Sequence, residues 1–188
     1  MKRVIYLCMF LLTAQLSAAP ITQYQISSIS DNLITLSNGT VLNVSPINML
    51  TLQGWHTSDF VELMSLNVGL AIAPPIQTGS NVTVLPPVFI LSNASQNNEQ
   101  IAVWMHTVPG FSNSDTPVIT DIDLTNRLIQ LSDATVWSYP PKDQAAVAFW
   151  NLGDLIMLGA NGLYTNTPTY GAILFNTRLQ SIVNALEQ

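Results

Sequence analysis

The sequence predicts a mainly all-β protein of two tandem β-rich repeats. The architecture would be a small barrel or sandwich-like, with a short helix after the hairpin of each repeat. Residues 33–63 align with residues 128–158 at a constant offset of 95 residues, and ten of the 31 aligned positions are identical. Composition alone would give about two identities, so the chain contains an internal duplication. Residues 26–29 and 33–44 are rich in Val, Ile, Leu and Thr, which favours strands. We expect a first repeat over residues 20–106, a linker over 107–117 and a second repeat over 118–188.

Residues 1–19 are predicted to be a secretory signal peptide. Two basic residues precede an apolar run at residues 4–12, and small residues follow it. The run is shorter than the roughly 20 residues that a membrane-spanning helix needs, which favours a signal peptide over an anchor. Cleavage after Ala18 and cleavage after Ala19 both remain open. We therefore expect the mature protein to be secreted or to lie in the periplasm or cell envelope.

Removal of the signal peptide leaves an acidic chain without cysteine. The single cysteine, Cys8, lies in the signal, which excludes disulfides, thiolate catalysis and cysteine-ligated metals from the mature protein. Eleven acidic residues face three basic ones (Arg127, Lys142 and Arg178), a net charge of −8. Because phosphate binding needs clustered cations, nucleic acid is not an expected partner. The chain is 48% hydrophobic and 9% charged, a balance typical of folded proteins.

Each repeat is expected to open with a hairpin. Residues 26–29 and 33–44 are strand-like, and Asn38-Gly39 favours a two-residue turn with positive φ at both positions. The second copy has Asp133-Ala134 instead. Because alanine resists positive φ, we expect a different turn or a strained one there.

A proline ends each hairpin and predicts a short helix or 3₁₀ segment. After eight intervening residues come Trp55 and Trp150, which we interpret as core anchors. Four positions further on, Asp59 and Asp154 are predicted to close a turn with a side-chain hydrogen bond before another strand.

Two strands, at residues 88–91 and 101–105, are predicted to complete the first repeat. Residues 173–176 (Ile-Leu-Phe-Asn) echo residues 90–93 (Ile-Leu-Ser-Asn), which predicts a similar hairpin at the end of the second repeat. The apolar spacing within residues 178–186 instead favours a helix, so the sequence leaves this choice open.

The pattern I-x-L-S-[DN]-G-T, then a proline, then W-x-x-G-D resembles repeats in uncharacterised exported two-repeat proteins of chlamydia-like intracellular bacteria. The resemblance covers most of the mature chain and consists of structural residues. The chain departs from the pattern at Ser58 and Ala134, where glycine would stand. The resemblance implies an exported location and a repeated fold, and it implies no activity.

The recurring Asp59 and Asp154 could form an acid pair like that of aspartic proteases. They are followed by Phe60 and Leu155, however, and not by the Thr/Ser-Gly of that family. The sequence therefore favours a turn-forming role for both aspartates.

Two arrangements around the histidines could form sites. His56, Asp59 and Glu62 have a spacing that could supply metal ligands, but a strand-and-turn segment would not place them on one face. His106 could join Asp115 or a serine, Ser112 or Ser114, in a hydrolase site. Because G-x-S-x-G is missing, we predict no catalytic residue. We also predict no metal, because its ligands would not share a face, and no cofactor.

Four tryptophans could form a platform for a carbohydrate or peptide: Trp55, Trp104, Trp137 and Trp150. Trp137 stands where the first copy has Leu42, so we predict it to be a surface aromatic residue. His56 stands where the second copy has Asn151. Trp137 and His56 are therefore the predicted binding residues.

The sequence thus predicts an exported, non-enzymatic structural, adhesive or interaction protein of the bacterial envelope or secreted fraction. Its partner would be an unidentified protein or glycan, and low surface charge favours self-association. No transmembrane helix is expected in the mature chain. Two alternatives remain: a secreted hydrolase with an unrecognised site, and a small outer-membrane β-barrel, whose alternating ten-residue segments the chain does not show consistently.

Overall fold

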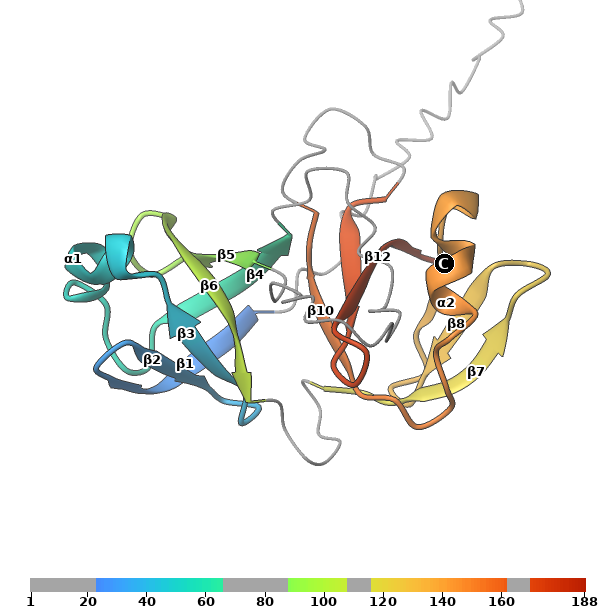
Figure 1. Cartoon of the computed structure of the whole chain (residues 1–188), viewed down its shortest axis with the longest axis horizontal. Helices are drawn as coiled ribbons and strands as arrows, with labels where there is room; N and C mark the ends of the chain where they lie inside the picture. The colour runs from blue at the N-terminus through green and yellow to red at the C-terminus, as the bar shows by residue number, and fades with distance from the viewer. Residues whose placement is uncertain (1–22, 66–87, 108–115, 162–169) are drawn as a thin grey trace, which may run out of the picture.

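A computed structural model describes residues 23–65, 88–107, 116–161 and 170–188, and these confirm a mainly β protein (Figure 1). The first half contains six strands: β1 (Gln23–Ser30), β2 (Leu33–Leu36), β3 (Val41–Val44), β4 (Phe60–Ser65), β5 (Val88–Asn93) and β6 (Glu99–Thr107). The second half contains β7 (Ile119–Asp123), β8 (Leu128–Leu131), β9 (Val136–Ser138), β10 (Ile156–Ala160), β11 (Ala172–Asn176) and β12 (Ser181–Glu187). The predicted signal peptide, residues 1–19, and most of the predicted linker, residues 108–115, lie outside the described residues.

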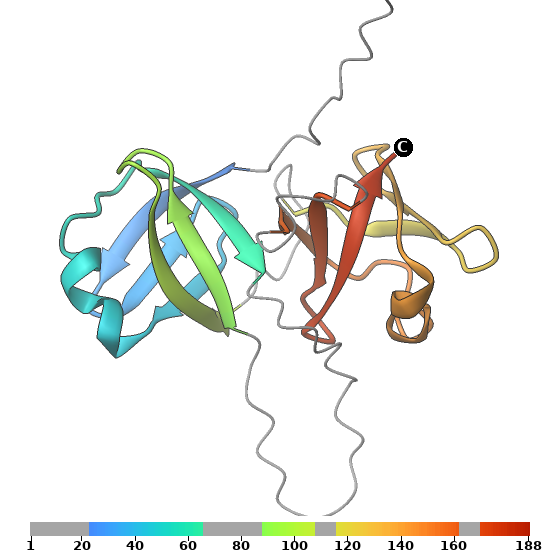
Figure 2. The same cartoon turned by 90° about the horizontal axis from the view of Figure 1, so that it is seen from above.

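The first six strands form a closed antiparallel barrel, which Figure 2 shows in the blue-to-green half. The strand order is β1-β2-β3-β6-β5-β4, and β4 pairs back onto β1 through Gln23–Glu62 and Gln25–Phe60. The small barrel that the sequence predicted is therefore present.

The second six strands follow the same order, β7-β8-β9-β12-β11-β10. A bridge between Val118 and Leu155 joins the two ends of this series. Two backbone hydrogen bonds support the closure: Ile119 N to Asp154 O at 3.0 Å and Gly153 N to Ile119 O at 2.8 Å. The two halves therefore close at equivalent places, and we call them the first and the second barrel.

The hairpin turn is the same in both halves, but it is not the two-residue turn expected at Asn38-Gly39. Four residues separate β2 from β3, and of Asn38 and Gly39 only the glycine has positive φ, at 84°. Ala134 takes the equivalent position at φ 69°, so the strained form of the expectation is confirmed. Asn38 instead stabilises the turn with its side chain, because its Oδ1 accepts the N–H of Thr40 at 3.0 Å.

The predicted short helical segment follows the hairpin in each half. The first half has the 3₁₀ segment η1 (Pro46–Asn48) and helix α1 (Met49–Leu52). The second half has η2 (Pro141–Asp143) and α2 (Gln144–Val147). The last residue of each helix, Leu52 or Val147, is buried in the core of its own half. Met49 of α1 and Ala146 of α2 also pack against these cores, so each helix covers its own half with apolar side chains.

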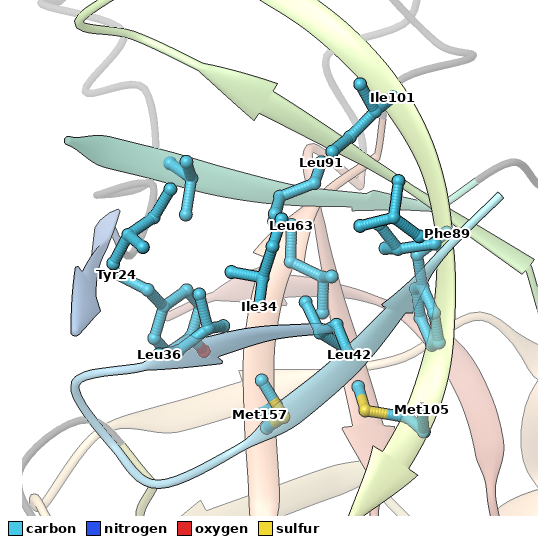
Figure 3. Close-up of a cluster of buried hydrophobic side chains, with 14 of the residues drawn as sticks. Tyr24, Ile34, Leu36, Leu42, Leu63, Phe89, Leu91, Ile101, Met105 and Met157 are labelled. Carbon is cyan, nitrogen blue, oxygen red and sulfur yellow. The ribbon is translucent and has the colours of Figure 1, made fainter. Parts of the chain in front are cut away.

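Two apolar cores fill the two halves, and they meet at strands β10 and β11. Met157, Ile173 and Phe175 belong to the core of the first barrel, where Figure 3 shows Met157 among its side chains. The rings of Phe89 and Phe175 pack edge to face, with centroids 5.0 Å apart. Strand β11 is buried on both faces because one face packs on each core.

A close approach of β4 and β10 joins the halves. The strands run parallel, with Met64 opposite Ala160. A Cβ on Gly159 would lie 2.5 Å from the carbonyl oxygen of Leu63, so only glycine permits this contact. The hydroxyl of the fully buried Tyr24 donates to the carbonyl of Leu158 at 2.8 Å and accepts its N–H at 3.1 Å.

The end of the chain is a strand, β12, so the hairpin indicated by the echo at residues 173–176 is confirmed and the helical alternative is wrong. Its backbone pairs with β11 on one side and β9 on the other. These two ladders outweigh the helix-like spacing of the apolar residues. In the described part of the chain, no helix is long and apolar enough to cross a membrane.

We predict that Gly159→Ala lowers the free energy of unfolding by about 1–3 kcal/mol, because the new methyl group meets backbone in a packed seam. Chemical unfolding followed by circular dichroism measures this loss. Gly171→Ala is the matched control, since a Cβ there meets no atom within 4 Å. Equal losses of stability in the two variants would contradict the close contact of β10 with β4 at Gly159.

Candidate functional site

Three side chains from β3 and β6 lie together on the outside of the first barrel: Asn43, Trp104 and His106. Burial alternates along β6, so that Trp104 and His106 point outward. Asn43 is the cross-strand partner of Trp104, and its amide nitrogen lies 3.1 Å from Nδ1 of His106. We call these three residues the outer-face cluster.

A β-bulge shapes this cluster. Leu42 pairs with Met105 and Val41 pairs with Thr107, which leaves His106 as an extra residue on β6. Bulges re-aim a side chain relative to the regular ladder. With the Asn43 amide as donor, Nδ1 of His106 accepts and Nε2 carries the ring proton.

The first barrel, which carries the cluster, has no lysine or arginine among its described residues. The described acidic residues of the first barrel are Asp31, Asp59, Glu62 and Glu99. No lysine or arginine occurs between residues 4 and 126. The cluster is therefore a neutral aromatic and amide surface on an acidic barrel.

Trp55 and Trp150 are core anchors, as predicted, and they also align the last strands of the two halves. Both are nearly fully buried. The indole Nε1 of Trp55 donates to Glu99 at 3.2 Å, and that of Trp150 donates to Ser181 at 2.8 Å. Glu99 begins β6 and Ser181 begins β12, so these residues occupy equivalent positions.

By this alignment the second barrel lacks the aromatic part of the cluster. Leu186 stands at the position of Trp104, and it pairs with Ser138 as Trp104 pairs with Asn43. A polar cross-strand bond is kept, because Gln188 Nε2 donates to Ser138 Oγ at 2.7 Å. The barrel therefore forms without a tryptophan or histidine at these positions.

The prediction that Trp137 is a surface residue is wrong. Its side chain is 1% exposed and lies in the core of the second half. Strand β9 points residue 137 inward, as β3 does with the equivalent, fully buried Leu42. The indole Nε1 donates to Thr135 Oγ1 at 2.7 Å. A ligand therefore cannot reach this ring in the closed barrel.

His56 is exposed in the turn between α1 and β4. Its backbone N–H donates to Asp59 Oδ2 at 3.0 Å, a contact that does not involve the ring. Binding through the His56 side chain stays a prediction. The neighbouring Glu62 accepts a hydrogen bond from Gln23 at 3.1 Å. Among the described residues, no group of three His, Cys, Asp or Glu could hold a metal ion.

Asp59 forms what we call an aspartate–asparagine corner. Besides the His56 N–H, its Oδ2 accepts the side-chain amide of Asn93 at 2.8 Å. The backbone carbonyl of Asp59 accepts the N–H of Ile26 from β1 at 2.9 Å. Burial favours the neutral acid, but the hydrogen bonds from Asn93 and His56 outweigh it and lower the pKa of Asp59.

Asp154 repeats this corner in the second half. Its Oδ2 accepts the N–H of Asn151 at 2.9 Å and the amide of Asn176 at 2.7 Å. Arg178 adds a two-pronged ion pair and also donates to the carbonyl of Phe149. Burial opposes ionisation, but the bonds from Arg178, Asn151 and Asn176 dominate and lower the pKa of Asp154.

The acid-pair alternative for Asp59 and Asp154 is therefore wrong. Each carboxylate is bound by an asparagine of its own half. Two carboxylates that share a proton would have one raised pKa, whereas both values here are lowered. The predicted turn-forming role is confirmed by the bonds that each aspartate accepts from the residue three positions earlier.

The hydrolase alternative requires His106 to act together with an aspartate or a serine. Its proposed partners, residues 112, 114 and 115, lie outside the described residues. Within the described chain, the ring of His106 contacts the neutral amide of Asn43.

Large apolar side chains are exposed on both helical connections: Ile47 and Leu50 in the first half, and Phe149 and Leu152 in the second. The two pairs do not occupy equivalent positions. Self-association through such surfaces stays a prediction.

Asp143 is a buried acidic residue at a position where the first half has the neutral amide of an asparagine. Its Oδ2 accepts the N–H of Asn184 at 3.0 Å. Asn48 takes the equivalent position in the first half, where its Oδ1 accepts the N–H of Ala102 at 3.0 Å. Burial raises the pKa of Asp143, and the Asn184 bond and the charge of Lys142 offset this only in part.

The chain matches no protein-family model, no curated protein and no solved structure. The resemblance to exported repeat proteins stays a prediction.

Sequence reasoning missed the two asparagines of the corners. A signal was present, because the echo between residues 90–93 and 173–176 ends in Asn93 and Asn176. It also placed Trp137 at the surface, although that side chain is buried, and did not single out Trp104. The outward position of Trp104 follows from its alternation with the buried Val103 and Met105 along β6.

We predict that Asp143→Asn raises the melting temperature at pH 7 by about 2–4 °C. A raised pKa means that the folded state holds the proton more tightly than the unfolded state. Stability is then fully present below the ordinary pKa of 3.8 and is lost as pH rises through the folded value. Asparagine cannot ionise, so the variant avoids the loss of stability at pH 7. At pH 3 the aspartate is already largely protonated in both states, so the substitution has little effect there.

Calorimetry at both pH values measures the difference. The exposed Asp121→Asn removes the same charge and serves as the control. A gain at pH 3 as large as that at pH 7 would contradict the role of ionisation.

Proposed function

We propose that the protein is an exported, non-enzymatic interaction protein, structural or adhesive, of the bacterial envelope or secreted fraction. It binds its partner through the outer-face cluster of the first barrel. One observation carries this proposal: the second barrel reaches the same strand order with Leu186 and Gln188 in place of Trp104 and His106. An indole and an imidazole that the fold does not require are available for binding.

The carboxylates support binding over catalysis. Asp59 and Asp154 hold their turns through several hydrogen bonds each, and Asp143 holds a strand of its barrel. A general base must reach a substrate proton, whereas these oxygens are directed at backbone and side-chain groups of the protein.

Export is supported by the first 19 residues and by the mature composition. A short apolar run follows two basic residues and precedes small residues, the order of a secretory signal. The mature chain contains no cysteine, so an oxidising compartment poses no risk of wrong disulfides.

We predict that a bacterial host producing the full sequence exports the protein and removes its signal. Intact mass and N-terminal sequencing of the periplasmic and culture fractions should show a chain beginning at Ala19 or Pro20. Leu11→Arg places a charge in the apolar run and should hold the precursor in the cytoplasm. The proposal fails if the wild type remains in the cytoplasm with all 188 residues.

A further inference from the structure

We infer that the outer-face cluster binds a neutral saccharide. This inference rests on the proposed function, because it names the partner class of the same site. It is carried by the aromatic face, the paired polar groups and the charge of the first barrel.

Trp104 supplies the stacking surface. Of the four tryptophans it alone is not buried, since Trp55, Trp137 and Trp150 each have an exposed fraction of 4% or less. Its strand is held between β3 and β5, which gives the ring a rigid base. Indole rings combine a large apolar face with low conformational freedom, which suits the apolar C–H face of a sugar ring.

Asn43 and His106 supply adjacent polar groups. Their mutual hydrogen bond uses the amide nitrogen and Nδ1, and it leaves the Asn43 oxygen as an acceptor and the His106 Nε2–H as a donor. A sugar hydroxyl is both donor and acceptor and can bond to either group. Asn43 faces Trp104 across the ladder at about 4.5–5.5 Å between Cα atoms, so one sugar ring can reach both.

The charge of the barrel selects a neutral ligand. All four described charged residues of the first barrel are acidic, and no lysine or arginine lies between residues 4 and 126. A sulfated or sialylated glycan would meet repulsion and no cation.

An extended peptide is a poorer occupant. Peptides that bind sheets by strand addition need an open edge. Strand β6 lies between β3 and β5, and the pairing of β1 with β4 closes the barrel among the described strands. The cluster can therefore offer side chains to a ligand but no backbone ladder.

The test uses the exported, processed protein on a printed array of neutral and anionic oligosaccharides, followed by isothermal titration calorimetry with the strongest neutral binder. The double variant Trp104→Leu/His106→Gln copies the residues of the second barrel, which favours retention of the fold. Leu186→Ala/Gln188→Ala makes matched changes on the second barrel. Melting temperatures of all variants report on folding.

We expect binding to neutral members only. The Trp104→Leu/His106→Gln variant should weaken it at least about tenfold with an unchanged melting temperature, and the second-barrel control should bind like the wild type. Trp104→Phe should restore part of the affinity, because a ring face is kept.

The inference is overturned if no neutral member binds, if anionic members bind equally well, or if the double variant binds as tightly as the wild type. None of these results bears on export or on the absence of catalysis, which the fractionation experiment and a cleavage assay test. Cleavage of the bound oligosaccharide, detected by mass spectrometry, would instead overturn the non-enzymatic function while supporting the saccharide site.

Discussion

The aspartate–asparagine corner is the interaction on which each half depends. The carboxylate of Asp59 ties the turn before β4 to the end of β5, while its backbone carbonyl accepts the N–H of Ile26 from β1. One residue thus joins the three strands at which the barrel closes. Asp154 does the same for β7, β10 and β11 through Ile119 and Asn176. Closure removes exposed strand edges, which would otherwise pair with other chains.

Both halves contain the aspartate–asparagine corner, but the contacts that join the halves are asymmetric. Strands β10 and β11 are buried on both faces because they line both cores, and Gly159 lets β10 touch β4. Tyr24 of β1 reaches across to Leu158. Ile26 and Ile119 donate their N–H groups to the carbonyls of Asp59 and Asp154, so the residue two positions before each, Tyr24 or Pro117, is equivalent. Proline has no hydroxyl, so the second half cannot repeat this contact from Pro117. The outer-face cluster lies on β3 and β6 of the first barrel.

The duplication was sufficient to predict the hairpins, the helical segments, the tryptophan anchors and the turn-forming aspartates, because these depend on local sequence. The form of the turn at Asn38-Gly39 was wrong although its signal is local, since only Gly39 has positive φ. The other errors arose where tertiary context decides. Strand β9 has three residues, too few for alternation to show that Trp137 points inward. The contact of Tyr24 with Leu158 spans 134 residues, so no local pattern could reveal it. The outer-face cluster requires the register of β3 and β6, which became known only from the ladder.

The central claim is that the shared residues hold the fold in two independent corners. Double-mutant cycles measured by chemical unfolding test it most directly, with alanine at Asp59 and Asn93 and at Asp154 and Asn176. The account predicts a coupling energy of about 1–3 kcal/mol within each corner. Between Asp59 and Asp154 it predicts a coupling below about 0.5 kcal/mol. Negligible coupling within the corners, or strong coupling between the two aspartates, would contradict it.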